Sequence, residues 1–154
     1  MKTQIRFANE SDIDTILAFM KDYYVIEGIE FNKDKSFDTL VDFLKSSSGK
    51  LFMIENNHTP IGYFCIAFSY TLENYGKDCF LDEIFIEANT RQMGIGSKVM
   101  SLIENYLIEN NFKAMHLIVN NRNNVALNYY LKNGFTLPDS RFMSKKLLNN
   151  RTKK

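Results

Sequence analysis

Residues 80–97 read FLDEIFIEANTRQMGIGS, and this stretch decides the fold. Its first part, residues 80–86, is apolar and strand-like, and an amphipathic helical pattern starts near Gly96. Glycines at a turn from strand to helix let backbone N–H groups approach an anion closely, and the helix N-terminus adds a partial positive charge. The turn at residues 91–96 (RQMGIG) therefore predicts a site for a phosphate or pyrophosphate group.

The composition is that of a globular protein. The chain has 154 residues, of which 45% are hydrophobic and 24% charged, with a formal net charge of +1. We expect a single domain at residues 1–148 and a polar tail at 149–154. The charge balance gives no sign of binding to nucleic acid or to an anionic membrane. No apolar run approaches the roughly 20 residues that span a bilayer, and the N-terminus lacks the apolar core of a signal peptide. Cys65 and Cys79 fit no disulfide framework or metal-ligand spacing, so we expect free thiols, a cytoplasmic protein and no metal.

Hydrophobic periodicity predicts the order β-α-α-β-β-β-α-β-α-β-β, an α/β (α+β) arrangement. Ser11 is predicted to cap the first helix. Because residues 115–119 alternate little between apolar and polar, they predict a central strand covered on both faces. The predicted strands are 5–8, 51–54, 61–70, 80–86, 115–119 and a final pair that begins at 135 and spans 142–147, and the predicted helices are 11–24, 36–44, 96–109 and 123–132.

Several phosphate-binding turns compete for the glycines. The Walker A pattern requires Lys and then Ser or Thr after its last glycine, but Ser precedes Lys after Gly96, which argues against an NTPase. The dinucleotide fingerprint fits Gly94 and Gly96, but Val99 stands where its third glycine belongs, and the next strand ends in Asn120 rather than an acidic residue. On the glycines alone, a helix-capping turn without a ligand also remains open.

The flanking residues favour a different ligand. The pattern Arg91-x-x-Gly94-x-Gly96 resembles the acyl-CoA signature (Q/R)xxGx(G/A) of the GNAT superfamily of N-acetyltransferases. A second segment, which begins at Asn123 and ends at Phe135, resembles the C-terminal NxxAxx(F/L)YxxxGF pattern of the same family. The resemblance covers nearly the whole chain. It implies a GNAT fold, a mixed twisted sheet of about six to seven strands with helices on both faces and with its fourth and fifth strands splayed apart.

The resemblance also implies the cofactor site. Acetyl-CoA would enter the wedge between the splayed strands, with its pyrophosphate on the backbone N–H groups of the glycine turn. Its pantetheine arm would pair with the fourth strand like an added strand, and Asn123 would touch it from the opposite wall. The implied cofactor-binding residues are Ile84, Phe85, Ile86, Arg91, Gln92, Met93, Gly94, Ile95, Gly96, Ser97 and Asn123.

Direct transfer of the acetyl group to an amine needs a base. A lysine-like amine has a pKa near about 10.4 and is neutral in only about one molecule in 10³ at pH 7. Asp82 and Glu83 are the candidates, and because adjacent strand residues point to opposite faces, one of them faces the cleft. Asp82 matches the carboxylate of polyamine acetyltransferases and Glu83 an acidic position of other family members, and a local bulge would exchange the two. Tyr130 stands at the family's tyrosine position and is implied to protonate the leaving thiolate or to hydrogen-bond the sulfur.

The acceptor is expected to bind against the first two helices and the loop before the fourth strand. Tyr24, Glu27 and Tyr70 are candidate contacts because carboxylates and aromatic rings suit a cationic amine, although a solvated surface fits the same residues. The favoured acceptor is a small-molecule amine such as a polyamine. The alternatives are a protein lysine or N-terminus, a non-catalytic acyl-CoA-binding module, and a nucleotide-binding βαβ domain. A homodimer is an expectation from the family alone.

Overall fold

The computed structural model describes residues 2–147, apart from the side chains of residues 91–93. The chain forms two compact units, Met1–Ile118 and Val119–Lys154. The first unit holds the sheet and the helices α1 to α3, and the second holds α4. The polar tail predicted at 149–154 lies outside the described residues.

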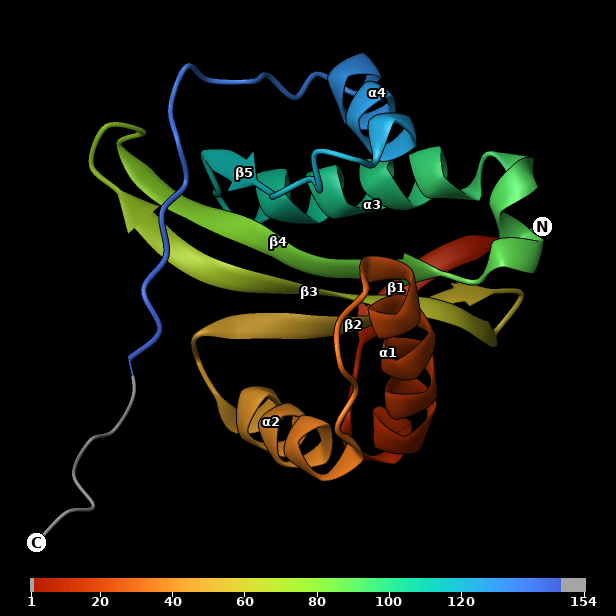
Figure 1. Ribbon diagram of the computed structural model, residues 1–154. Coiled ribbons are helices and arrows are strands. Elements are labelled where there is room, and N and C mark those ends of the chain that lie inside the picture. The colour runs from red at the N-terminus through yellow and green to blue at the C-terminus, as the bar shows by residue number, and fades with distance from the viewer. Residues whose placement is uncertain (1, 148–154) are drawn as a thin grey trace, which may run out of the picture. The chain divides into compact units, whose positions relative to one another are not determined.

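The first unit is built on a five-stranded sheet in the order β1-β2-β3-β4-β5. Strands β1 to β4 pair antiparallel in chain order, whereas β5 follows α3 and pairs parallel to β4 (Figure 1). The mixed sheet expected from the sequence is therefore confirmed. The strands are β1 (Thr3–Phe7), β2 (Gly49–Asn56), β3 (Thr59–Thr71), β4 (Gly76–Ile86) and β5 (Ala114–His116).

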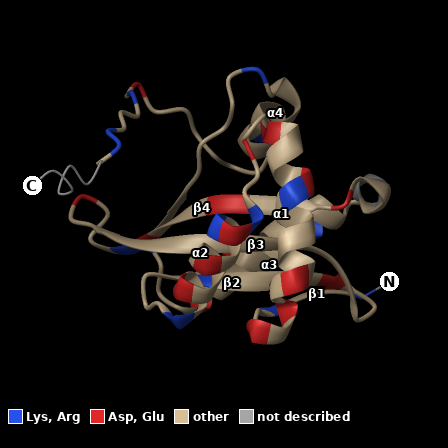
Figure 2. Cartoon of the chain, turned by 60° about the horizontal axis from the view of Figure 1, so that its bottom comes forward, with Lys and Arg blue, Asp and Glu red and all other residues tan. Residues whose placement is uncertain are grey.

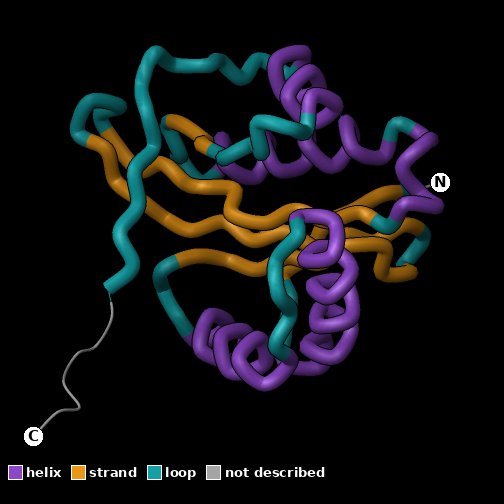
Figure 3. The backbone as a smooth tube through the Cα atoms, in the orientation of Figure 1, coloured by secondary structure: helices purple, strands orange, loops and turns teal. Residues whose placement is uncertain are grey.

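Helices cover both faces of this sheet (Figure 3). The helices α1 (Ile13–Glu27) and α2 (Lys33–Lys45) lie on one face, and α3 (Ile95–Glu109) lies on the other. A short 3-10 helix, η1 (Glu10–Asp12), leads into α1, and a second, η2 (Ala88–Met93), connects β4 to α3. The three helices predicted in this part of the chain are confirmed.

Each face of the sheet has its own apolar core. On the α3 face, Phe52 stacks on Phe64 at 4.5 Å between ring centroids, and Tyr106 of α3 meets Phe52 edge-on. Burial of each such side chain contributes roughly 1.5–3 kcal/mol, so the two layers of helices are held firmly on the sheet. The buried residues of the other core, called the α1–α2 core below, include Ile16, Leu17, Met20, Leu40, Leu51, Met53, Tyr63 and Phe85.

Ser11 does not cap the first helix as predicted. The N-cap residue of α1 is Asp12, and the 3-10 helix η1 that leads into α1 is capped by Asn9, whose Oδ1 accepts a hydrogen bond from the Ser11 backbone N–H at 2.9 Å. Asp12 completes a capping box by accepting from the Asn9 N–H. The Asp12 carboxylate also forms a bidentate ion pair with Arg6, which fixes β1 to the start of α1 and which a local sequence pattern does not reveal.

A buried carboxylate holds the β3–β4 hairpin and the end of β5 together. The side chain of Asp78 is fully buried. Its oxygens accept hydrogen bonds from Ser69 Oγ at 2.6 Å, from Thr71 Oγ1 and from Asn74 Nδ2 at 3.2 Å, and His116 Nε2 lies at 3.1 Å. Burial alone would raise the pKa of Asp78, but these partners more than offset it and hold that pKa well below its usual range.

Charges of both signs are interspersed on the helices of the first unit. Figure 2 shows acidic and basic residues along α2 rather than a run of one sign. In α2, for example, Asp34 lies between Lys33 and Lys35. This pattern is typical of a solvated helix face.

The second unit contains α4 (Asn124–Lys132), which confirms the predicted helix. The strand pair predicted from Phe135 and at 142–147 was wrong, because the described residues 135–147 form no strand. Pro138 lacks the N–H that a central ladder position requires, and exposed apolar side chains such as Phe142 leave no buried face to fix a register. The sheet therefore has five strands among the described residues rather than six to seven. For the same reason, β5 lies at the sheet's edge and not at the centre as predicted.

Candidate active site

A bulge in β4 decides which carboxylate faces the α1–α2 core. In the pairing of β3 with β4, Cys65 lies opposite Glu83 and Ile66 lies opposite Leu81, so Asp82 has no opposite residue in β3. This extra residue reverses the usual alternation, and Glu83 points to the same face as Cys65, which packs against the α1–α2 core. Asp82 is exposed, whereas Glu83 is half-buried.

Two tyrosine hydroxyls hold the Glu83 carboxylate. Tyr63 Oη of β3 donates to Oε2 at 2.6 Å, and Tyr24 Oη of α1 donates to Oε1 at 3.1 Å. Burial raises the pKa of Glu83, the two hydroxyl donors lower it, and the negative charge of Asp82 raises it again, so that the net shift is upward. Burial likewise raises the pKa values of both tyrosines, which keeps them protonated as donors. A half-buried carboxylate of raised pKa has the properties of a general base.

The glycine turn opens α3 in a conformation that suits an anion. Gly94 ends η2 and caps α3 with φ +70°, in the left-handed region that favours glycine. Among the described atoms, none would lie within 4 Å of a Cβ at this position. No described side chain caps the helix, its first turn holds no acidic residue, and its first backbone bond runs from the Lys98 N–H to the Gly94 carbonyl. The N–H groups of Ile95, Gly96 and Ser97 precede that bond, so they fit a phosphate.

The parallel strands β4 and β5 diverge beside this turn. Their ladder covers only Asp78–Phe80 of β4, which continues to Ile86. On its other edge, β4 stays paired with β3, where Gly62 lies opposite Ile86. A Cβ on Gly62 would stand 2.0 Å from the Phe85 carbonyl oxygen, so a glycine is required for this close approach. The segment predicted to run along pantetheine, Ile84–Ile86, is therefore held firmly from the β3 side.

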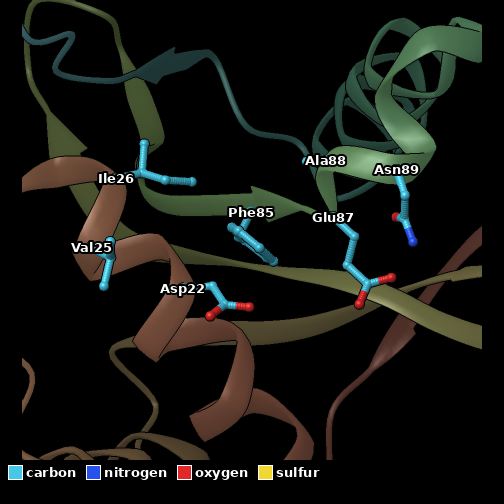
Figure 4. Close-up of a pocket in the computed structure, with 7 residues that line it drawn as sticks. All are labelled: Asp22, Val25, Ile26, Phe85, Glu87, Ala88 and Asn89. Atoms are coloured by element: carbon cyan, nitrogen blue, oxygen red, sulfur yellow. The ribbon is translucent and has the colours of Figure 1, made fainter.

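A pocket of about 450 Å³ lies between α1 and the end of β4 (Figure 4). Its lining includes Asp22, Val25 and Ile26 of α1, together with Phe85, Glu87 and Asn89. Phe85 and Glu83 are two residues apart on β4 and share a face, so the pocket and Glu83 lie on the same side of the sheet. A pocket with two carboxylates and apolar walls suits a cationic ligand that carries an apolar chain.

The structure brings some of the predicted acceptor residues together and separates others. Tyr24 reaches Glu83 directly. Glu27 ends α1 and is half-buried. Tyr70 is 72% exposed. It lies five residues along β3 from Cys65, the residue opposite Glu83, so Tyr70 is about 17 Å from Cys65 and on the opposite face of the sheet. Tyr70 is thus not placed beside Glu83.

In the second unit, Asn123 is the N-cap of α4 and Tyr130 lies within that helix. The Asn123 side chain caps the helix by accepting from the Ala126 N–H at 3.0 Å. The ring of Tyr130 packs edge-on against Tyr129 and Phe135, at 5.4 and 5.3 Å between centroids. The sequence motif of this segment thus has a clear structural use within the unit, besides the cofactor contact that the resemblance implies. Of the predicted turn residues, the side chains of Arg91, Gln92 and Met93 lie outside the described part of the structure.

Two site features escaped the sequence analysis. Tyr63 is separated from Glu83 by 20 positions in the chain, and only the β3–β4 register reveals their contact. The pocket joins segments some 60 positions apart, and the only signal for it was the apolar pair Val25 and Ile26 near the acidic Asp22.

Among the described residues, no group of three His, Cys, Asp or Glu side chains is arranged to hold a metal ion. Over the same residues, no helix combines the length and apolarity needed to cross a membrane.

Comparison with known proteins identifies the family. The model of the acetyltransferase (GNAT) family matches residues 14–135, and the chain belongs to this family. Among curated proteins, the spermidine/spermine N(1)-acetyltransferase-like protein 1 of Homo sapiens is 25% identical over 142 residues, which cover 85% of this chain and 20% of that protein. The chain thus spans about a fifth of the length of this relative.

Solved structures share the fold. A possible acetyltransferase from Clostridium difficile 630 superposes with a TM-score of 0.85 at 19% identity, over 96% of this chain and 99% of that one. A predicted acetyltransferase from Clostridium acetobutylicum, solved with acetyl-CoA, gives 0.75 at 22% identity over 94% and 96%. The aminoglycoside N-acetyltransferase AAC(6')-Iy, solved with CoA, gives 0.77 at 15% identity over 94% and 95%. These likenesses confirm the GNAT fold that the sequence motifs implied.

Proposed function

We propose that this chain transfers the acetyl group of acetyl-CoA directly to the primary amine of a small molecule, with Glu83 as the base. The observation that carries the proposal is the half-buried Glu83 carboxylate with its raised pKa, held by two tyrosines. A protonated amine must lose its proton before it can attack a thioester, and Glu83 would take that proton, directly or through one water. Asp82 is exposed and bulges out of the ladder, which favours Glu83 over it.

The remaining parts of the proposed site hold the donor. Acetyl-CoA supplies the acetyl thioester that the amine attacks. The N–H groups at the start of α3 would bind its pyrophosphate, and the backbone of Ile84–Ile86 would face its pantetheine arm. We assign Tyr130 to protonate the departing thiolate and Asn123 to a cofactor contact, on the resemblance of the second motif. Arg91, Gln92 and Met93 keep the backbone role that the first motif implies.

The acceptor is proposed from the pocket. Asp22 and Glu87 would attract a cationic amine, while Val25, Ile26 and Phe85 would cover its carbon chain. Glu27, at the end of α1, would add a further negative charge near this opening. The human relative's name points to spermidine and spermine, which are amines of this kind. A cytoplasmic location is consistent with two free cysteines.

Free-thiol release from acetyl-CoA tests the proposal. The purified chain is supplied with a panel of diamines, polyamines, amino acids and lysine-containing peptides, and CoA binding is measured separately by calorimetry. We expect turnover with one or more small amines and little with peptides. CoA binding without turnover for any acceptor would instead identify an acyl-CoA-binding module. Turnover with peptides alone would refute the small-molecule acceptor, and absence of both binding and turnover would refute the enzyme.

A further inference from the structure

The Glu83 carboxylate receives one phenol on each oxygen, and the two phenols come from different layers of the fold. Tyr63 belongs to β3 in the sheet, and Tyr24 belongs to α1 above it. We infer that Tyr63 and Tyr24 are positioning residues, which orient the Glu83 carboxylate and set the pH range over which it works as a base. This inference rests on the proposed function, because it assigns two further residues to the same site.

Tyr63 is the rigid member of the pair. Its side chain is 1% exposed, and its ring stacks parallel to Phe19 and packs against Phe85, both at 6.5 Å between centroids. A ring held on two sides has a single accessible rotamer, so its hydroxyl can direct only one point of the site. That point is Glu83 Oε2, at the short distance of 2.6 Å.

Tyr24 closes the carboxylate from the helix side. It lies in the last turn of α1, and its ring meets Phe31 edge-on at 5.9 Å. Its longer bond of 3.1 Å to Oε1 and its partial exposure place it nearer to the solvent than Tyr63. With both oxygens fixed, the carboxylate plane cannot rotate freely, and its remaining lone pairs keep a constant direction.

The charges and burial around Glu83 make the two tyrosine hydroxyls the main groups that favour its ionised form. The titratable groups around Glu83 are Tyr24 from α1, Tyr63 and Cys65 from β3, and Asp82 from β4. Burial and Asp82 both raise the pKa of Glu83, and burial raises the pKa of the Cys65 thiol so that it stays neutral. Of these four groups, only the tyrosines favour the ionised carboxylate. The proton of the amine therefore passes to Glu83, while both phenols keep their own protons.

Tyrosine-to-phenylalanine variants separate this role from simple packing. Tyr63→Phe and Tyr24→Phe each remove one donor and keep the ring. The control is Tyr106→Phe, because Tyr106 is a partly buried tyrosine on the opposite face of the sheet, where its ring meets Phe52. The pH dependence of kcat/KM is measured for acetyl transfer to the best amine of the panel. In parallel, the carboxyl carbon of Glu83 is titrated by NMR in protein labelled with ¹³C-glutamate.

We expect the acidic limb of the pH profile to move to higher pH in Tyr63→Phe and Tyr24→Phe, with a loss of about tenfold or more in kcat/KM on that limb. The Glu83 carboxyl signal should titrate at higher pH in both variants and remain unchanged in Tyr106→Phe. Asp82→Asn should move both readouts the opposite way, to lower pH. If Tyr63→Phe does not fold, Tyr24→Phe alone decides the matter, since its ring is less buried.

An unchanged Glu83 titration in both variants would overturn the inference, whatever happens to the rate. The NMR titration needs no substrate, so it still tests whether the two tyrosines set the pKa of Glu83 if no amine is acetylated and the proposed function fails. Conversely, turnover with an unchanged pH profile in both variants would refute the positioning role and leave the enzyme intact.

Discussion

Replacement of Gly94 by alanine tests the glycine turn with a built-in control. Gly94 and Gly28 have nearly the same left-handed backbone, with φ of +70° and +69°, and a Cβ on either would meet nothing within 4 Å. The cost of Gly→Ala is therefore conformational at both positions. An alanine in this region costs about 1–2 kcal/mol, partly offset by about 0.4–1 kcal/mol from the unfolded chain. Both variants should thus lose about 1 kcal/mol of unfolding free energy.

The two variants should differ in CoA binding. Gly94 stands beside the first N–H groups of α3, whereas Gly28 ends α1. A methyl group or a backbone shift at Gly94 that removes one hydrogen bond to a phosphate oxygen weakens binding about tenfold or more. Urea unfolding gives the stability of each variant, and calorimetry gives its Kd for CoA. If Gly94→Ala binds CoA as tightly as Gly28→Ala does, the pyrophosphate does not sit on this turn.

Three further predictions follow from the geometry. Asp78→Asn should lower the unfolding free energy at pH 7 by about 1–3 kcal/mol, because the donors around the buried carboxylate lose their charged partner. The folded-state pKa of Asp78 is depressed, so its contribution to the unfolding free energy is fully present above the unfolded pKa of about 3.9 and fades below it. The unfolding free energy should therefore fall less steeply with decreasing pH in the variant than in the wild type. Parallel pH dependences of the two proteins would contradict this expectation. Gly62→Ala should push β3 away from the Phe85 carbonyl and destabilise the chain by about 3 kcal/mol, as measured by thermal unfolding. A loss below about 1 kcal/mol would show that β3 and β4 can move apart at little cost. Asp82→Asn should keep most of kcat, and a near-complete loss in the acetyl-transfer assay would transfer the role of base to Asp82.

The sequence carried much of the fold because its signals were local. The glycine turn, the amphipathic face of α3 and the motif from Asn123 onward all lie in contiguous segments, and each predicted its element. Where a signal needed a partner from elsewhere, prediction failed. Ser11 caps neither helix, because Asn9 caps η1 in a capping box with Asp12, and Asp12, the N-cap residue of α1, is held in turn by Arg6 of β1.

The sequence predicted only part of the candidate site, for the same reason. Asp82 and Glu83 are adjacent in the sequence and equal in chemistry, and no local pattern indicates a bulge in β4. Our proposal of Glu83 rests on the register with β3 and on hydroxyl donors that lie 20 and 59 positions away in the chain. Periodicity also predicted strands after Phe135, in a segment whose apolar residues find no buried face.

The most direct test of the central claim is the rate of acetyl transfer by Glu83→Gln. Glutamine keeps the size of the side chain, its amide oxygen can still accept a hydrogen bond from one tyrosine and its NH2 can donate to the hydroxyl oxygen of the other, but it cannot take a proton at neutral pH. With the best amine of the panel, we predict that kcat falls by about 10²–10⁴-fold and that the acidic limb disappears from the pH profile, while the Kd for CoA stays unchanged. A Glu83→Gln variant that keeps the wild-type kcat and pH profile would contradict the account.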